Sequence, residues 1–127
     1  MKKVMCFGTF DKLHPGHWYY LSESKKKGDY LIVVVARDEN VLKIKNKLPR
    51  ESERERLENI KNIDFVDEVV LGDLIDRYAV VKREKPDILC FGYDQVVDEK
   101  KLGEFFVGEM IRHQSFQPEI YKSSKMM

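Results

Sequence analysis

Hydrophobic and polar positions alternate along the chain with two different periods. Short apolar runs rich in β-branched residues predict strands over residues 3–7, 30–36, 65–71 and 88–91. The run at residues 30–36 is apolar throughout, which is typical of a strand covered on both faces. Helical spacing predicts helices over residues 17–27, 51–63, 74–84 and 100–113, although Gly103 and Gly108 weaken the last of them. Residues 120–122 are predicted to form a final short strand.

Strands that alternate with helices in this way predict an α/β fold. We expect one domain over residues 1–127, built as a doubly wound, Rossmann-like parallel sheet with helices on both faces and right-handed crossovers. The sequence contains no linker, repeat or low-complexity segment. Ligands on such sheets bind beyond the carboxyl ends of the strands, near the point where the strand order reverses. Candidate chemistry is therefore expected in the segments that follow the predicted strands.

Charge and cysteine content narrow the class of protein. Charged residues make up 35% of the 127 and nearly cancel to a formal net charge of +1, which argues against a generally basic, nucleic-acid-binding surface. Cys6 and Cys90 lie in apolar runs and are expected to be core thiols, because their spacing fits neither a zinc site nor a disulfide framework. No apolar run is long enough to cross a bilayer, and the N-terminus lacks a signal-peptide pattern. We expect a cytoplasmic protein without a membrane partner.

The segment GTFDKLHPGH, at residues 8–17, directly follows the first predicted strand. A strand that stops at Gly8 and a short loop would carry His14 and His17 to the start of the next helix. Unpaired N–H groups and the positive end of the helix dipole meet at such a corner, which suits a polyphosphate. Because the two histidines are three residues apart across a Pro-Gly bend, their imidazoles can converge on neighbouring phosphates. Solvent-facing loop histidines are the simpler alternative, but they leave the rest of the block unexplained.

The block resembles the HxGH signature of the nucleotidyltransferase superfamily, whose members join a nucleotide to a phosphate-bearing acceptor and release pyrophosphate. Such a transfer needs positioning and charge stabilisation more than a strong base, because the acceptor phosphate is already ionised. The resemblance implies that His14 and His17 are catalytic donors to the triphosphate. It also implies that a lysine after the second strand, Lys47 or Lys43, contacts phosphate, although a solvated charged run is the usual meaning of such a segment.

The same resemblance implies further contacts. Arg56, in the helix expected after residue 51, matches the arginine that reaches the acceptor or the phosphates, with Arg54 as the second choice; surface ion pairs are the alternative for both. Asp94, in the run FGYDQ after the fourth strand, would bind ribose hydroxyls or a base amino group unless it caps the next helix. The remaining implied nucleotide contacts are Thr9, Phe10, Pro15, Gly16, Tyr121, Ser123 and Ser124.

Two branches of the superfamily resemble the chain most. Glycerol-3-phosphate cytidylyltransferases are similar in the GTFDxLHxGH block, the VDEV run at residues 66–69 and an Asp after the fourth strand, but their C-terminal RTxGIST signature is missing here. Archaeal-type FAD synthases, which transfer AMP from ATP to FMN, are similar in ARDE at 36–39, GYDQ at 92–95 and YKSSK at 121–125. We favour the second branch, which implies ATP and FMN as substrates, a divalent ion such as Mg²⁺ that enters with the nucleotide, no metal cage made by the protein, and a homodimer. A nucleotide-binding protein without turnover is the remaining alternative.

Overall fold

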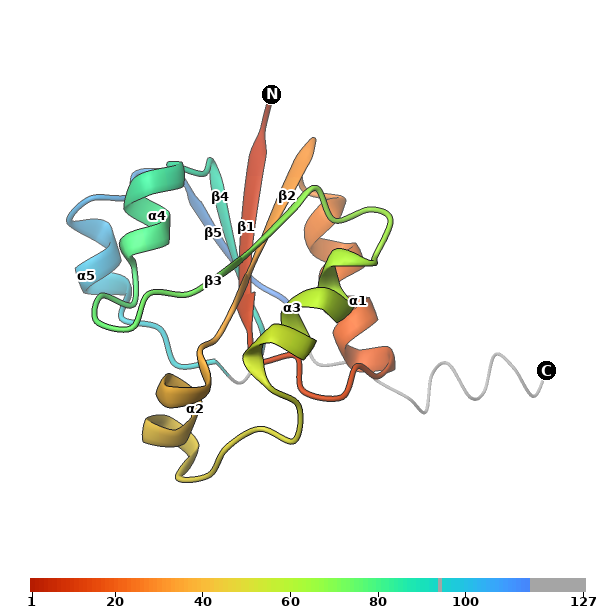
Figure 1. Ribbon diagram of the computed structural model, residues 1–127. Coiled ribbons are helices and arrows are strands. Elements are labelled where there is room, and N and C mark those ends of the chain that lie inside the picture. The colour runs from red at the N-terminus through yellow and green to blue at the C-terminus, as the bar shows by residue number, and fades with distance from the viewer. Residues whose placement is uncertain (94, 115–127) are drawn as a thin grey trace.

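A five-stranded sheet forms the centre of the molecule (Figure 1). The structure is a computed structural model and describes residues 1–93 and 95–114. All neighbouring strands are parallel, and their order in space is β3-β2-β1-β4-β5. This arrangement confirms the predicted α/β class and the parallel sheet. The strands are β1 (Lys3–Gly8), β2 (Tyr30–Val35), β3 (Glu68–Leu71), β4 (Ile88–Phe91) and β5 (Glu109–Arg112).

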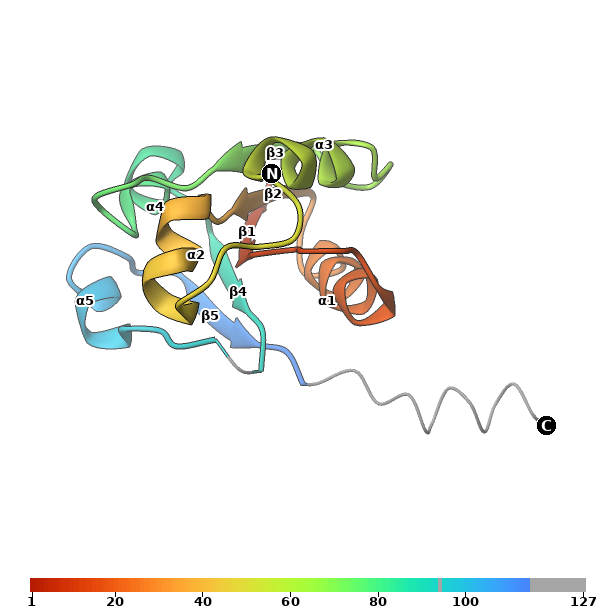
Figure 2. The same cartoon turned by 60° about the horizontal axis from the view of Figure 1, so that its bottom comes forward.

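Helices cover both faces of this sheet (Figures 1 and 2). They are α1 (Pro15–Lys25), α2 (Asp38–Lys45), α3 (Glu53–Lys61), α4 (Ala79–Glu84) and α5 (Glu99–Gly103). α1 and α3 pack on one face and α4 and α5 on the other, whereas α2 lies beyond the carboxyl ends of the strands. The chain therefore winds outward from β1 in both directions, and the strand order reverses between β1 and β4.

Alternate positions along each strand contribute to two separate cores. Cys6 and Cys90 pack with Leu21 of α1 and Ile60 of α3 on one face, and Met5 faces the core on the other. Both cysteines are free and buried, as the sequence predicts. Burial raises the pKa of the Cys6 thiol well above its usual value and that of Cys90 to about 11. At neutral pH both therefore remain protonated.

The β1–β4 ladder ends before β1 does, and this opens the switch point. Its last pair is Cys6 and Cys90, and beyond that pair the hydroxyl of Tyr20 from α1 stands between the strands. The hydroxyl accepts a hydrogen bond from the Phe7 N–H (3.2 Å) and lies within donating distance of the carbonyl oxygens of Phe7 (3.1 Å) and Cys90 (2.8 Å). Backbone groups that the ladder releases are thereby satisfied. The two strands part where a ligand is expected to bind.

The predicted helix over residues 100–113 is wrong. α5 ends at Gly103, and residues 109–112 form β5 instead. A Cβ at Gly108 would lie only 2.1 Å from the carbonyl oxygen of Asp87, and the N–H of Glu109 donates to that same oxygen (3.1 Å). Because only glycine permits this close approach, position 108 brings the chain alongside β4, where it pairs as a strand.

Other boundaries also differ from the prediction. α2 forms within a charged run for which no helix is predicted. α4 begins only at Ala79, because the carboxylates of Asp73 and Asp76 accept hydrogen bonds from the N–H groups of residues 75, 76 and 78 and hold this segment in turns. The predicted strand at residues 120–122 lies outside the described residues. In the part of the chain that the structure describes, no helix has the length and apolar character to span a membrane.

Candidate active site

The loop between β1 and α1 is built on the ring of Phe10. This side chain is only 2% exposed and lies beneath Gly8, where a Cβ would come within 2.6 Å of the ring. Phe10 has a φ of 55°, in the left-handed region that residues other than glycine rarely occupy. Its ring meets His17 edge-on, with 5.6 Å between the ring centroids. Packing on Phe10 therefore holds the loop against the sheet and supports one of the two histidines, so Phe10 can face a ligand only through its backbone.

His14 and His17 cap the start of α1 reciprocally. The Nδ1 atom of His14 accepts a hydrogen bond from the N–H of Gly16 (3.0 Å), and the Nδ1 atom of His17 accepts one from the N–H of His14 (3.3 Å). A neutral imidazole whose Nδ1 accepts a hydrogen bond carries its proton on Nε2. Each ring therefore keeps an Nε2–H donor for a ligand, and the two rings are stacked with their centroids 3.8 Å apart. The bonds that begin the helix also fix the tautomer of both histidines.

The position of His17 predicts how it titrates. Burial and the neighbouring His14 lower its pKa from 6.5 to about 4, so that the ring is neutral at pH 7. Since the unfolded chain takes up this proton first, the contribution of the neutral ring to stability is complete above about pH 6.5 and is lost as the pH falls toward 4. We expect the Cε1 proton resonance of His17 to titrate near pH 4 in the ligand-free protein, with the signal assigned through its loss in His17→Asn. A midpoint near 6.5 would contradict the burial of this ring.

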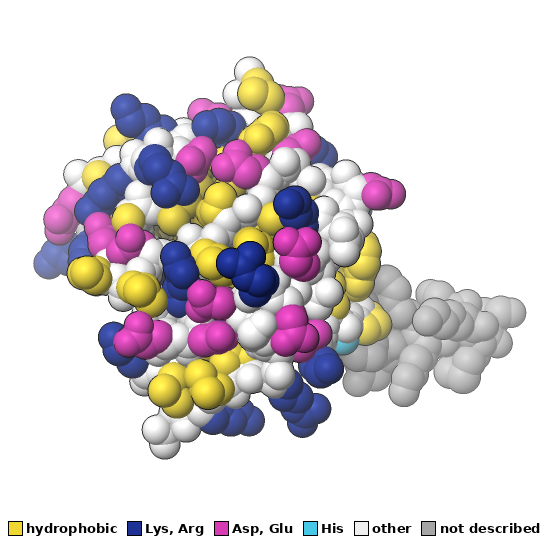
Figure 3. Space-filling view, in the orientation of Figure 1, with side chains coloured by type: hydrophobic (Ala, Val, Ile, Leu, Met, Phe, Trp, Pro, Cys, Tyr) yellow, Lys and Arg dark blue, Asp and Glu magenta, His cyan; other side chains and the backbone are white. Residues whose placement is uncertain are grey.

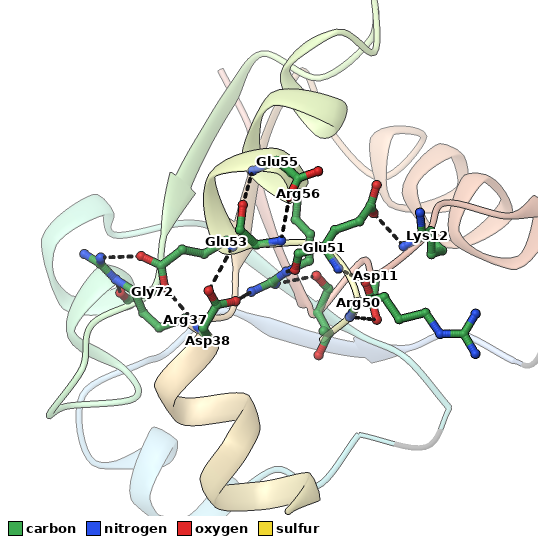
Figure 4. A network of polar contacts seen from close by, with 12 residues as sticks. Asp11, Lys12, Arg37, Asp38, Arg50, Glu51, Glu53, Glu55, Arg56 and Gly72 are labelled. Atoms are coloured by element: carbon green, nitrogen blue, oxygen red, sulfur yellow. Dashed lines mark hydrogen bonds and ion pairs between the residues drawn. The ribbon is translucent and has the colours of Figure 1, made fainter. Parts of the chain in front are cut away.

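A network of polar contacts ties the same loop to the start of α3 (Figure 4). The two carboxylate oxygens of Asp11 accept hydrogen bonds from the N–H groups of Glu51 (2.9 Å) and Arg50 (2.8 Å), and the N–H of Lys12 donates to the Glu51 carboxylate (2.8 Å). Desolvation acts to raise the pKa of Asp11, but the two N–H bonds and the charge of Arg56 outweigh it and hold the pKa below its usual value. Asp11 is thus an ionised anchor for the loop.

Arg56 lies at the centre of this network, and its side chain is fully buried. Its guanidinium donates to the carbonyl oxygens of Thr9 (2.7 Å) and Glu51 (3.1 Å) and forms an ion pair with Asp38 (2.6 Å). Asp38 and Glu53, the first residues of α2 and α3, accept hydrogen bonds from each other's backbone N–H groups (2.9 and 3.2 Å). Arg56 therefore joins the loop between β1 and α1, which we call the histidine loop, to the first residues of α2 and α3. This position differs from the direct contact with phosphate or acceptor that the resemblance implies.

Three lysines lie on α2 and the segment that follows it. Lys43, Lys45 and Lys47 are all exposed. α2 ends at Asn46, whose φ of 61° is left-handed, and the chain then returns toward α3 (Figure 2). Of the three, Lys45 is the lysine whose charge contributes to lowering the pKa of His17. The two lysines predicted from the sequence, Lys43 and Lys47, flank it.

The other predicted contacts fall into two groups. Pro15 and Gly16 form the first turn of α1 next to the histidines. Since none of the described glycines has a positive φ, Gly16 contributes its small size and its N–H here, without an unusual backbone conformation. Four predicted contacts lie outside the described residues, namely Asp94, Tyr121, Ser123 and Ser124.

Sequence reasoning did not identify the partners through which Asp11 and Arg56 connect the loop to α2 and α3. One local signal was available: the pattern S-x-x-E at Ser52 and Glu55 is a capping box, in which each side chain accepts a hydrogen bond from the other residue's N–H (both 3.2 Å). It places the start of α3 correctly. No local pattern shows that Asp11 meets residues 50 and 51, or that Arg56 meets Asp38, because these contacts depend on how the chain folds back.

The surface over α2 combines apolar and basic side chains (Figure 3). Leu42, Ile44 and Leu48 are 43%, 74% and 60% exposed and alternate with the three lysines along the chain. Elsewhere on the face shown in Figure 3, positive and negative side chains are mixed. No group of three or more His, Cys, Asp or Glu residues among those described is placed to hold a metal ion. This end of the sheet thus offers donors for phosphate and, beside them, apolar side chains for a ring.

Several proteins of known name are similar in sequence. The FAD synthase of Ferroglobus placidus is 49% identical over 105 residues, which cover 82% of this chain and 67% of the relative. The FAD synthase of Methanocorpusculum labreanum is 47% identical over 102 residues, or 80% and 71% of the two chains. The FAD synthase of Methanolacinia petrolearia is 39% identical over 131 residues, or 98% and 86% of the two chains.

Solved structures and a family profile complete the comparison. The crystal structure of the lipopolysaccharide core biosynthesis protein from Thermoplasma volcanium superposes with a TM-score of 0.84 at 40% identity, over 92% of this chain and 99% of that one. Pantoate-beta-alanine ligase from Francisella tularensis has a TM-score of 0.60 at 17% identity over 91% and 60%, which is a likeness of fold alone. The profile described as Cytidylyltransferase-like matches residues 5–125. With that match over nearly the whole chain, and with its histidine loop at the reversal of a parallel sheet, the protein belongs to the cytidylyltransferase-like family.

Proposed function

We propose that this protein transfers AMP from ATP to the phosphate of FMN and releases FAD and pyrophosphate. The observation that carries the proposal is the pair of Nε2–H donors that His14 and His17 keep at the switch point. Two Nε2–H donors held beside a helix N-terminus suit the phosphates of a nucleoside triphosphate. The relatives named FAD synthase, at 39% to 49% identity, support ATP and FMN as the substrates.

In this reaction an FMN phosphate oxygen attacks the α-phosphorus of ATP in line, and the bond from that phosphorus to the pyrophosphate oxygen breaks. The attacking oxygen is already ionised, so the protein contributes alignment and charge stabilisation. The Nε2–H of His17 stabilises the charge that develops on the α-phosphate, and the positive end of the α1 dipole adds to this effect. We call α2 and the residues that follow it up to Leu48 the α2 segment. His14 and one lysine of this segment, Lys43, Lys45 or Lys47, hold the departing pyrophosphate. These groups need little rearrangement, because capping already fixes both rings.

The acceptor site has to hold both a phosphate and an apolar ring. Exposed Leu42, Ile44 and Leu48 alternate with lysines on the α2 segment, so that a flavin ring can cover apolar side chains while its phosphate meets an ammonium group. Glycerol 3-phosphate carries no apolar ring and would gain little from these side chains. The α2 segment therefore supports FMN over the smaller acceptor.

The divalent ion, Mg²⁺, is proposed to enter with the triphosphate. Both oxygens of the nearby Asp11 carboxylate already accept N–H bonds, and the described residues offer no metal cluster, so the phosphates themselves would be its main ligands. When bound, the ion neutralises charge on the β- and γ-phosphates. We also propose a homodimer that acts in the cytoplasm. The proposed nucleotide contacts beyond the two histidines are Thr9, Phe10, Pro15, Gly16, Asp94, Tyr121, Ser123 and Ser124.

A competition experiment tests the choice of substrates. When the protein is incubated with equal concentrations of ATP, CTP, FMN and glycerol 3-phosphate, we expect FAD as the new nucleotide product, identified by its mass, with one pyrophosphate released per FAD. A reaction without protein gives the background. CDP-glycerol in place of FAD would overturn the choice of branch. If no pair of substrates yields pyrophosphate, the proposed transfer reaction is overturned.

A further inference from the structure

Arg112, the last residue of β5, donates hydrogen bonds to the backbone of the segment that follows β4. It pairs in register with Phe91, the last residue of β4. One terminal nitrogen of its guanidinium, Nη1, donates to the carbonyl oxygens of Gly92 (2.7 Å) and Gln95 (2.8 Å), with that of Tyr93 at 3.4 Å. Three carbonyl oxygens of one short segment thus converge on a single cationic nitrogen. We call Gly92, Tyr93 and Gln95 the β4 loop.

The side chain of Gln95 fastens the same loop on its other side. Its Oε1 atom accepts a hydrogen bond from the Gly92 N–H (2.8 Å), and its Nε2 atom donates to the carbonyl oxygen of Phe7 (2.6 Å). Phe7 lies in β1, directly before Gly8, where the histidine loop begins. The carboxamide therefore bridges β1 and β4 where these strands part. Together Gln95 and Arg112 connect the β4 loop to the strands on both sides of β4.

This arrangement matters for a negatively charged ligand. The carbonyl oxygens of Gly92, Tyr93 and Gln95 lie at the carboxyl edge of the sheet, beside the switch point. Carbonyl oxygens that faced a triphosphate would repel it, whereas here the positive charge of Arg112 engages them. Contacts that hold Gly92 and Gln95 in place also reduce the entropy that nucleotide binding would lose by fixing them. Arg112 is exposed and does not belong to either core. Its hydrogen bonds therefore act mainly on the conformation of the β4 loop.

We propose that Arg112 is a positioning residue: it holds the β4 loop in the shape that receives the nucleotide. The inference rests on the proposed function for the site, because it takes the ligand at the switch point to be a nucleoside triphosphate. Arg112 acts through the loop and touches neither the acceptor nor the reacting phosphorus. Its loss should therefore weaken nucleotide binding while the chemical step at saturating nucleotide stays nearly unchanged.

The test compares Arg112→Met with the control Arg83→Met. Arg83 is also exposed and forms an ion pair with Glu84 (3.0 Å). It lies near the C-terminal end of α4, at the opposite edge of the sheet from the β4 loop. We expect Arg112→Met to raise the dissociation constant of ATP, measured by calorimetry without FMN, about tenfold. We expect kcat at saturating ATP and the KM for FMN to stay within about twofold of wild type. Arg83→Met should match wild type in all three. Arg112→Lys should lie in between, because its ammonium lies closer to the backbone than Nη1 of arginine and reaches fewer of the carbonyls.

Two outcomes would overturn the inference. One is an unchanged ATP affinity in Arg112→Met. The other is a loss of thermal stability, kcat and both affinities together, which would mark Arg112 as a structural residue only. The proposed function fails separately: if wild type makes no FAD but binds CTP, the same comparison of Arg112→Met with Arg83→Met is made with CTP and still decides the role of Arg112. If wild type binds neither nucleotide, both proposals are overturned.

Discussion

Replacing His17 with asparagine is expected to lower kcat for FAD formation by about a hundredfold to a thousandfold, the scale found when a donor to a developing negative charge is removed. The asparagine oxygen can stand in for Nδ1 and accept the N–H of His14, so the cap of α1 is retained. The Nε2–H donor has no counterpart in asparagine. Because this donor acts mainly in the transition state, the affinity for ATP should change much less than kcat.

His17→Gln is the matched variant, since its longer amide places a donor near the position of Nε2 but no longer reaches back to cap the helix. We expect His17→Gln to keep more turnover than His17→Asn and to lose about 1 kcal/mol of stability through the weakened cap. Steady-state kinetics, ATP calorimetry and thermal unfolding of both variants check the pair. If ATP affinity fell in parallel with kcat in His17→Asn, the histidine would bind ground state and transition state alike, which contradicts its assigned role.

Replacing Arg56 with methionine is expected to lower the free energy of unfolding by about 2 to 4 kcal/mol, because two backbone carbonyl oxygens lose their donor and the Asp38 carboxylate, which is 31% exposed, loses its cation. The change leaves the Asp38 carboxylate without its cation and removes the donors to Thr9 and Glu51. Methionine fills a similar volume, so lost packing contributes little. The effect should appear as a lower denaturant midpoint with an unchanged slope.

Arg54→Met is the control for this variant, because Arg54 is exposed on the same helix and undergoes the same chemical change. Its stability should stay within about 0.5 kcal/mol of wild type. The comparison separates two roles for Arg56. If Arg56→Met were as stable as Arg54→Met but had lost affinity for FMN or ATP, the arginine would serve as a ligand contact, and the buried network would not describe the protein in solution.

The parts of the site that the sequence predicts correctly depend on local signals. The apolar run before Gly8 and the Pro-Gly bend before His17 place the histidine loop between a strand and a helix, where the structure has it. Both signals involve residues close together in the chain, so neither depends on distant packing. The position of the histidine loop at the carboxyl edge of β1 could therefore be predicted from the sequence alone.

The features that the sequence did not reveal depend on contacts between distant segments. The expected helix at 100–113 fits local spacing, but the close approach of Gly108 to Asp87 decides for a strand. The family resemblance singles out Arg56 as a contact to phosphate or acceptor, but its buried bond to the Thr9 carbonyl oxygen depends on how the chain folds back. The ion pair with Asp38 likewise exists only because α2 and α3 begin side by side. Tertiary packing overrode local preference at residues 109–112, and it supplied the partners of Arg56.

In the proposed reaction, two imidazoles with fixed tautomers hold the triphosphate while AMP is transferred. The most direct test is a crystal structure of the protein with α,β-methylene ATP, which binds like ATP but cannot be cleaved at the α-phosphorus. We predict that the Nε2 atoms of His14 and His17 lie within hydrogen-bond distance of phosphate oxygens, while their Nδ1 atoms keep the backbone bonds that cap α1. A nucleotide bound with both rings turned away from its phosphates would contradict this claim.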